Sequence, residues 1–209
     1  MKIVCLDLEG VLVPEIWIAI SEAAGIAGLR VTTREEPDYD KLMKMRLELL
    51  KKNNLKLPDL QKITGTIELL PGALEFTKKL REQTQLVILS DTYEEFAKPL
   101  MEKLGWPTLF CNSFETDKDG VITAYKLRQK HGKKKAVEAF QSMGLKVFAA
   151  GDSYNDLEMV QSADSCCLFR APEKIRVSFP KIPAAESYDG LLGKIESFLK
   201  YSLSGFSST

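Results

Sequence analysis

Four polar side chains, each beside an apolar run or at the expected start of a helix, are the residues of this sequence best suited to chemistry. They are Asp7, Ser90, Lys133 and Asp152. The apolar run that starts at Ile3 leads into Asp7, and Glu9 follows two residues later, so both carboxylates can point to one face of a strand. Two carboxylates, a hydroxyl and an ammonium group together indicate phosphoryl transfer.

Asp7 is the expected nucleophile. A carboxylate that attacks phosphorus forms an acyl phosphate and splits one difficult displacement into two easier ones. Because two anions must then approach each other, we expect a hard divalent cation, and Mg²⁺ fits this role. Asp7, Asp152 and a backbone carbonyl near Glu9 would hold the cation. Asp156, one helical turn after Asp152, would orient a metal-bound water.

Ser90 and Lys133 are the expected ligands of the remaining phosphate oxygens, through a hydrogen bond and a point charge. Both are expected at helix starts, where free amide groups add to anion binding. Each residue alone has a simpler explanation. Asp7 could cap a helix, Ser90 could lie in a turn, and Lys133 belongs to a run of three lysines. The prediction therefore depends on the combination.

The composition of the whole chain narrows the class of partner. Its 209 residues suffice for one domain with an insertion. The 29 basic and 29 acidic residues cancel, which removes any global electrostatic reason to expect nucleic acid or an anionic membrane. Asp7 and Glu9 interrupt the first apolar run too early for a signal peptide, and no later run approaches a membrane span. We expect a cytoplasmic protein with a small-molecule substrate.

Cysteine and histidine chemistry is not expected. The four cysteines have neither the spacing of a zinc site nor that of a redox pair, so they are predicted to be buried free thiols. They are Cys5, Cys111, Cys166 and Cys167. His131, the only histidine, lies in a polar stretch typical of a loop.

Strand-like apolar runs alternate with segments of helical period along the chain. The runs cover residues 3–8, 86–89, 146–150 and 165–169. This alternation predicts an α/β fold with a doubly wound, Rossmann-like parallel sheet, whose strand carboxyl ends bring the four side chains together. Asp119-Gly120 predicts a peripheral hairpin between residues 108 and 127. The last helix is expected over 190–202, and residues 205–209 are expected to fray.

Residues 15–70 have mostly helical period and are predicted to form a helical cap inserted after the first strand, so that the core comprises 1–14 and 71–209. On an expected helix over 39–52, Arg46 falls in the middle of the apolar arc. A buried guanidinium needs an anionic partner, which is either a substrate carboxylate or an internal acid. Glu15 is expected in the first turn of a helix, where an acid complements the helix dipole.

The same residues resemble the motifs of the haloacid dehalogenase-like hydrolases. The four motifs are matched, in order, by Asp7–Val11, Ser90-Asp91-Thr92, Lys133 and Gly151–Asp156. The resemblance implies that Asp7 is the nucleophile, that Ser90, Asp91 and Lys133 lie at the phosphate, and that Mg²⁺ is the cofactor. Phosphatases of this superfamily usually carry Asp two residues after the nucleophile, where this chain has Glu9.

Further segments resemble the bifunctional phosphoserine phosphatase/homoserine phosphotransferase family, which carries the same glutamate. They are Leu6–Trp17, Pro37–Asp40 and Leu127–Lys130, and the similarity extends to about residue 200. It implies a magnesium-dependent reaction on O-phospho-L-serine, with the phosphoryl group passed to water or to L-homoserine. It also implies that Glu15 and Arg46 hold the ammonium and carboxylate groups of the amino acid and that Asn155 contacts the substrate.

In the favoured mechanism, Asp7 attacks phosphorus while protonated Glu9 gives a proton to the departing serine alkoxide. Three alternatives stay open. A related phosphatase for a sugar phosphate or nucleotide would not need a charge pair such as Glu15 and Arg46. A phospho-accepting signalling receiver would have a different order of motifs and no cap, and an inactive scaffold of the same fold would release no phosphate. A monomer or a homodimer is expected.

Overall fold

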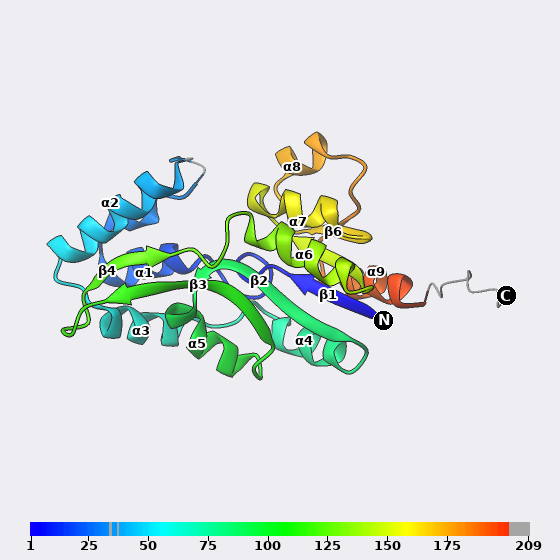
Figure 1. Ribbon diagram of the computed structural model, residues 1–209, viewed down its shortest axis with the longest axis horizontal. Coiled ribbons are helices and arrows are strands. Elements are labelled where there is room, and N and C mark those ends of the chain that lie inside the picture. The colour runs from blue at the N-terminus through cyan, green and yellow to red at the C-terminus, as the bar shows by residue number, and fades with distance from the viewer. Residues whose placement is uncertain (34, 37, 201–209) are drawn as a thin grey trace.

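The computed structural model describes residues 1–33, 35–36 and 38–200 (Figure 1). Within these residues the strands form one seven-stranded sheet of order β4-β3-β2-β1-β5-β6-β7. The strands are β1 (Lys2–Leu6), β2 (Gln85–Tyr93), β3 (Thr108–Thr116), β4 (Ile122–Lys126), β5 (Lys146–Gly151), β6 (Ser165–Phe169) and β7 (Ala184–Ala185). Every neighbouring pair is parallel except β3–β4, the hairpin that turns at Asp119-Gly120. The predicted α/β fold is confirmed, and the predicted hairpin forms one edge of the sheet.

Helices follow most strands and supply the outer layers. They are α1 (Ile16–Ala24), η1 (Ala27–Arg30), α2 (Tyr39–Lys52), α3 (Leu57–Thr66), α4 (Ala73–Arg81), α5 (Glu94–Lys103), α6 (Gly132–Ser142), η2 (Tyr154–Asp156), α7 (Leu157–Ser162), α8 (Glu173–Ser178) and α9 (Tyr188–Lys200). The expected helix over 39–52 coincides with α2.

The two faces of the sheet carry separate apolar clusters, because side chains alternate along a strand. Val4 and Leu6 of β1 pack in the larger cluster with α4, α5 and α9. Ile3 and Cys5 pack in a second cluster with α6 and α7. Figure 1 shows α6 and α7 on the opposite side of the sheet from α4 and α5. This double covering holds the carboxyl ends of the central strands in fixed positions.

The helices α1, η1, α2 and α3 all fall within residues 15–70. The two ends of this segment lie side by side, because the Leu70 N–H donates to the Leu12 carbonyl at 2.9 Å. Between these points α3 contacts α5, and α2 contacts β4. In Figure 1 this group of helices lies beside the β3–β4 end of the sheet. The division into a core and a cap stays a prediction.

One element boundary bears directly on the site. Strand β2 continues through Ser90 to Tyr93, and α5 begins only at Glu94. Ser90 therefore lies on an extended strand and not at a helix start, contrary to expectation. The reason is nonlocal, since β2 pairs with β3 again at Tyr93, opposite Asn112, after an irregularity between Leu89 and Tyr93.

Other expectations have simple outcomes. All four cysteines are free, with Cys5 and Cys167 buried and the other two partly buried. His131 precedes α6 as its N-terminal cap residue and pairs with Glu158 at 2.8 Å. The last helix, α9, ends at Lys200, and the expectations for residues 201–209 and for Pro37 lie outside the described residues. None of the helices in the described ranges combines enough length and apolar character to cross a bilayer.

Candidate active site

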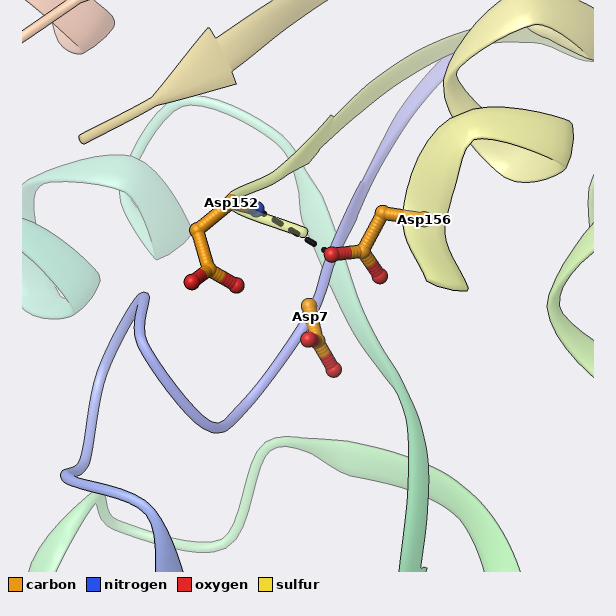
Figure 2. A group of neighbouring side chains, drawn as sticks. All are labelled: Asp7, Asp152 and Asp156. Carbon is orange, nitrogen blue, oxygen red and sulfur yellow. Dashed lines mark hydrogen bonds between the residues drawn. The ribbon is translucent and has the colours of Figure 1, made fainter. Parts of the chain in front are cut away.

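Three carboxylates meet at the carboxyl ends of β1 and β5 (Figure 2). Asp7 directly follows β1 and is buried, and its N–H donates to the Ala150 carbonyl of β5 at 3.0 Å. Asp152 directly follows β5, and Asp156 ends the short helix η2. One oxygen from each of these three carboxylates lies within 4.8 Å of the others. Parallel pairing of β1 with β5 thus joins residues that are far apart in sequence.

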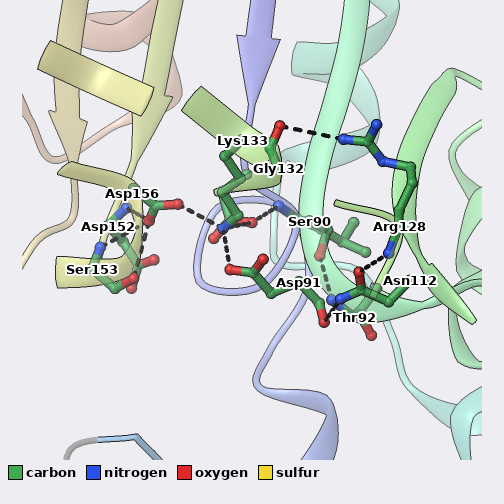
Figure 3. Close-up of polar contacts among 12 residues, drawn as sticks. Ser90, Asp91, Thr92, Asn112, Arg128, Gly132, Lys133, Asp152, Ser153 and Asp156 are labelled. Atoms are coloured by element: carbon green, nitrogen blue, oxygen red, sulfur yellow. Dashed lines mark hydrogen bonds and ion pairs between the residues drawn. The ribbon is translucent and has the colours of Figure 1, made fainter. Parts of the chain in front are cut away.

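The Lys133 ammonium lies among these carboxylates (Figure 3). Its Nζ is 2.7 Å from Asp156, 2.9 Å from Asp7 and 3.5 Å from Asp91. Burial by itself would lower the pKa of Lys133, but the charges of Asp156, Asp7 and Asp91 outweigh it and hold the pKa well above its ordinary value. The simpler explanation of Lys133 as a solvated surface residue is wrong, because its side chain is 8% exposed. It supplies a fixed positive charge beside Asp7.

Asp156 is satisfied entirely by protein donors. Its Oδ1 accepts from Lys133, and its Oδ2 accepts from the Asp152 N–H, the Ser153 N–H and the Ser153 hydroxyl, each at 3.1 Å. Its side chain is fully buried. Gly151 permits this arrangement, because a Cβ there would lie 2.3 Å from the Asp156 carboxyl carbon. Asp156 is thus placed to orient Lys133 and the Asp152 loop.

The site has a deficit of positive charge that a cation would correct. Burial, followed by the charge of Asp156, raises the pKa of Asp7 well above its ordinary value. The same two causes raise the pKa of Asp152 to about 7. Carboxylate oxygens in this number suit a hard divalent ion such as Mg²⁺. The main chain also approaches closely here, since a Cβ on Gly10 would lie 2.4 Å from an Asp152 oxygen. The residues present therefore fit the ion that the sequence predicts.

A hydrogen-bonded bridge connects the end of β2 with the loop before α6 (Figure 3). The buried Asn112 of β3 donates to the Asp91 carbonyl at 2.9 Å and accepts from the Arg128 N–H at 3.0 Å. The Thr92 N–H donates to the buried Ser90 hydroxyl at 3.2 Å. Sequence analysis missed Asn112, whose only local signal is that it directly follows the apolar run Leu109–Cys111.

A cavity of about 550 Å³ opens beside these groups. It is lined by residues of the sheet edge, of the 15–70 segment and of the region from η2 to α8, namely Glu9, Glu15, Trp17, Thr32, Thr33, Tyr39, Leu42, Arg46, Asp91, Thr92, Ser153, Tyr154, Asn155, Pro172, Lys174 and Ile175. The structure therefore brings Glu9, Glu15, Arg46 and Asn155 together around one space, which Asp91, the neighbour of Lys133, also lines.

Arg46 is the unusual residue of this cavity. It is 5% exposed, its guanidinium lies 4.4 Å from the centre of the Trp17 ring, and its Nη2 donates to the Val31 carbonyl at 2.8 Å. Its Nε is buried without a hydrogen-bond partner. Among the residues that the structure describes, no carboxylate forms an ion pair with Arg46. A buried charge left in this way is costly unless an anion binds it.

Glu9 and Glu15 differ from expectation in how they meet α1. Glu15 is the N-terminal cap residue and not part of the first turn, and its side chain makes no capping hydrogen bond. The Glu9 carboxylate instead accepts from the Ile16 N–H at 2.7 Å. Burial, followed by the charge of Glu15, raises the pKa of Glu9 to about 7. A substantial fraction of Glu9 is therefore protonated at neutral pH.

The chain matches one protein family and two curated relatives over most of its length. The model of the haloacid dehalogenase-like hydrolases matches residues 1–164. Phosphoserine phosphatase ThrH of Pseudomonas aeruginosa is 52% identical over 191 residues, which cover 91% of this chain and 93% of that protein. A phosphoserine phosphatase of Pseudomonas syringae pv. tomato is also 52% identical over 191 residues, or 91% of this chain and 81% of that protein.

Solved structures agree on the fold. A phospho-aspartyl intermediate analogue of phosphoserine phosphatase aligns over 95% of this chain and 99% of its own, with a TM-score of 0.76 and 20% identity. A phosphoserine phosphatase in apo form aligns over 96% and 98%, with a TM-score of 0.73 and 22% identity. The chain therefore belongs to the haloacid dehalogenase-like hydrolases and, within them, to the same family as the two Pseudomonas phosphoserine phosphatases.

Proposed function

We propose that this chain is a magnesium-dependent phosphoserine phosphatase that forms a phosphoaspartate at Asp7 and passes the phosphoryl group to water or to L-homoserine. One observation carries the proposal. A single cavity is lined both by Asp91, whose carboxylate lies 3.5 Å from Lys133, and by the buried Arg46, whose Nε has no hydrogen-bond partner. We call the region around Asp7, Asp91 and Lys133 the phosphate pole and the region around Arg46 the amino-acid pole. Together they match a phosphorylated amino acid.

At the phosphate pole, an Asp7 oxygen forms a bond to phosphorus while the bond from phosphorus to the serine oxygen breaks. The electron pair of that bond passes to the serine oxygen. Lys133 and Ser90 bind the non-bridging phosphate oxygens. The products of this step are the phosphoaspartate and serine. The distance of 2.9 Å from Lys133 to Asp7 supports these roles.

Glu9 donates a proton to the departing serine oxygen and later removes a proton from the incoming water or homoserine hydroxyl. Its raised pKa, about 7, supports both roles, because the acid and base forms are both populated at neutral pH. Each acceptor oxygen then bonds to phosphorus as the acyl phosphate bond breaks, and the Asp7 carboxylate is restored.

Asp7, Asp152 and a main-chain carbonyl near Glu9 would hold Mg²⁺. When bound, the ion neutralises charge between the nucleophile and the phosphate and polarises the phosphate oxygens. Asp156 does not need to contact the ion, since its oxygens already accept from Lys133, Ser153 and the Asp152 main chain. Its role in the proposal is to position these groups.

At the amino-acid pole, Arg46 binds the substrate carboxylate, Glu15 binds the ammonium group and Asn155 contacts the substrate. The unpaired Nε of Arg46 supports this assignment, because a guanidinium recognises a carboxylate with two parallel hydrogen bonds. A phosphatase for sugar phosphates or nucleotides would not need the charges of Glu15 and Arg46. The proposal includes a cytoplasmic enzyme whose partners are small molecules.

The deciding experiment incubates the protein and Mg²⁺ with phosphoserine, with and without L-homoserine, and measures free phosphate and phosphohomoserine. We expect phosphate in the first case and both products in the second. Asp7→Asn is the control and should abolish both. Release of phosphate from sugar phosphates or nucleotides but not from phosphoserine would contradict the proposal, and release from none would identify an inactive scaffold.

A further inference from the structure

Two tyrosine hydroxyls join the 15–70 segment to the strand that carries Ser90. The hydroxyl of Tyr39, the first residue of α2, lies 2.7 Å from the hydroxyl of Tyr93, the last residue of β2. Tyr93 is 1% exposed, and its ring stacks on Phe114 of β3 with 3.7 Å between centroids. Burial raises the pKa of Tyr39 to about 12, so both hydroxyls stay protonated at neutral pH and either one can donate.

A second contact holds the same end of α2. The Tyr125 hydroxyl of β4 donates to the Asp40 carboxylate, and the Tyr125 and Tyr39 rings meet edge to face with 5.7 Å between centroids. The first turn of α2 is therefore attached to β2 through one hydrogen bond and to the edge strand β4 through another. Both attachments are made by tyrosine hydroxyls.

Helix α2 also carries Arg46, seven residues after Tyr39. Seven residues are close to two helical turns, so Tyr39 and Arg46 lie on one face of α2, and both line the cavity. An α-helix moves nearly as a rigid rod over two turns. A displacement of the Tyr39 end of α2 would therefore also displace the Cα of Arg46.

We propose that the Tyr39–Tyr93 hydrogen bond is a positioning latch that sets the amino-acid specificity of the site by fixing Arg46 at the right distance from Asp7. The inference rests on the proposed function, in which Arg46 binds the carboxylate of the donor and of the amino-acid acceptor. Loosening the latch weakens both interactions and leaves the phosphate end intact. Water, which has no carboxylate, then competes better with homoserine.

The test uses Tyr39→Phe, Tyr93→Phe and the double variant, each assayed with phosphoserine and with an aryl phosphate that lacks amino-acid groups. Loss of one neutral hydrogen bond corresponds to a factor of about three to ten. We expect each single variant to raise the KM for phosphoserine, relative to that for the aryl phosphate, by that factor, and to lower the ratio of phosphohomoserine to phosphate. The double variant should be no worse than either single one, because both hydroxyls act through one bond.

Tyr188→Phe is the matched control. Its hydroxyl also makes a part-buried hydrogen bond, to the Val11 carbonyl at 2.6 Å, but it lies on α9 and not on α2. We expect Tyr188→Phe to lower the melting temperature without changing either ratio. The latch is overturned if Tyr188→Phe shifts the two ratios as much as Tyr39→Phe does, or if the effects of Tyr39→Phe and Tyr93→Phe add in the double variant.

Amide hydrogen exchange tests the latch independently of any substrate. In Tyr39→Phe, peptides that cover residues 39–52 should exchange faster than in the unmodified protein, whereas Tyr188→Phe should leave them unchanged. Unchanged exchange in Tyr39→Phe would refute the latch even if the protein hydrolyses phosphoserine. Faster exchange in a protein that does not hydrolyse phosphoserine would refute the proposed function and retain the latch as a device that positions Arg46.

Discussion

Glu9 connects the reacting groups to the helical segment through its extra methylene group. Its carboxylate reaches the Ile16 N–H at the start of α1, and it also faces the cavity. An aspartate at this position has a side chain one carbon shorter and would not span the same distance. The residue therefore combines an acid–base role in the proposed reaction with the N-terminal hydrogen bond of α1.

Glu9→Gln should slow phosphoserine turnover by about 10² or more, because general acid catalysis typically contributes about 10² to 10⁴. The serine alkoxide is a poor leaving group and needs the proton. An aryl phosphate has a good leaving group, so its turnover should fall much less. Steady-state kinetics with both substrates measures the difference. Equal losses of turnover for the two substrates would show that Glu9 is not the general acid.

The pH profile gives an independent check on the same residue. Since the pKa of Glu9 is raised to about 7, its acid form is lost as the pH rises through that value. The phosphoserine rate of the unmodified enzyme should therefore decline above about pH 7 when leaving-group departure limits the rate. Glu9→Gln has no proton to lose and should lack this decline.

Arg46→Ala should raise the KM for phosphoserine by about ten- to a hundredfold, since a hydrogen bond to a charged group contributes about 1.5–3 kcal/mol. The aryl phosphate has no carboxylate, so its KM should change little. Arg30→Ala is a suitable control, because Arg30 lies in the same segment but pairs with Glu22 on the surface. An unchanged phosphoserine KM in Arg46→Ala would refute the amino-acid specificity.

At the scale of elements, Asn112 fastens two parts of the phosphate site to each other. Its side chain links the end of β2 to the loop before α6 through two hydrogen bonds. Because β3 also pairs with β2, the Asn112 side chain holds the loop that precedes Lys133 close to Asp91. Phosphate-binding groups from separate elements are thus kept at a fixed spacing.

Asn112→Ala should destabilise the protein by about 1–3 kcal/mol in total, because it removes two part-buried hydrogen bonds, to the Asp91 carbonyl and from the Arg128 N–H, of about 0.5–1.5 kcal/mol each. Urea unfolding measures the change. Asn53→Ala is the control: the Asn53 side chain donates to the Leu49 carbonyl at an exposed helix end, and its loss should cost much less. Equal losses of unfolding free energy in the two variants would contradict a special stabilising role for the Asn112 bridge.

Much of the element pattern could be predicted from sequence because it depends on local periodicity. The spacing of apolar residues sufficed for α2, and apolar runs located the central strands. The extension of β2 to Tyr93 depends on pairing with β3, which no local pattern records. The stacking of Trp17 on Arg46 likewise arises only when α1 and α2 pack together, and the bond between Tyr39 and Tyr93, 54 residues apart, only when the helical segment meets the sheet.

At the scale of the whole molecule, the chain is neutral but its charge is unevenly distributed. The net formal charge is zero, whereas Asp7, Asp152 and Asp156 crowd around Lys133 at one edge of the sheet. Folding must bring these carboxylates together against their repulsion. A cation that binds only the folded chain should therefore stabilise the protein as well as support its activity.

Mg²⁺ at one hundred times its dissociation constant should stabilise the fold by about 2.7 kcal/mol, and chelation should abolish phosphoserine turnover. Thermal unfolding with and without Mg²⁺ measures the first effect. Asp152→Asn should lose most of this stabilisation. Asp119→Asn, an equal change of charge in the exposed hairpin turn, should retain it. Equal stabilisation of both variants would place the ion elsewhere.

The single main-chain hydrogen bond between Leu12 and Leu70 has an evolutionary consequence. Because the residues between Leu12 and Leu70 start and finish at neighbouring points, the entropy of closing that loop changes only slowly with its length. Recombination at this junction can exchange one helical segment for another of different size without disturbing the strand order. A lineage can in this way acquire new substrates while it inherits its phosphorus chemistry unchanged.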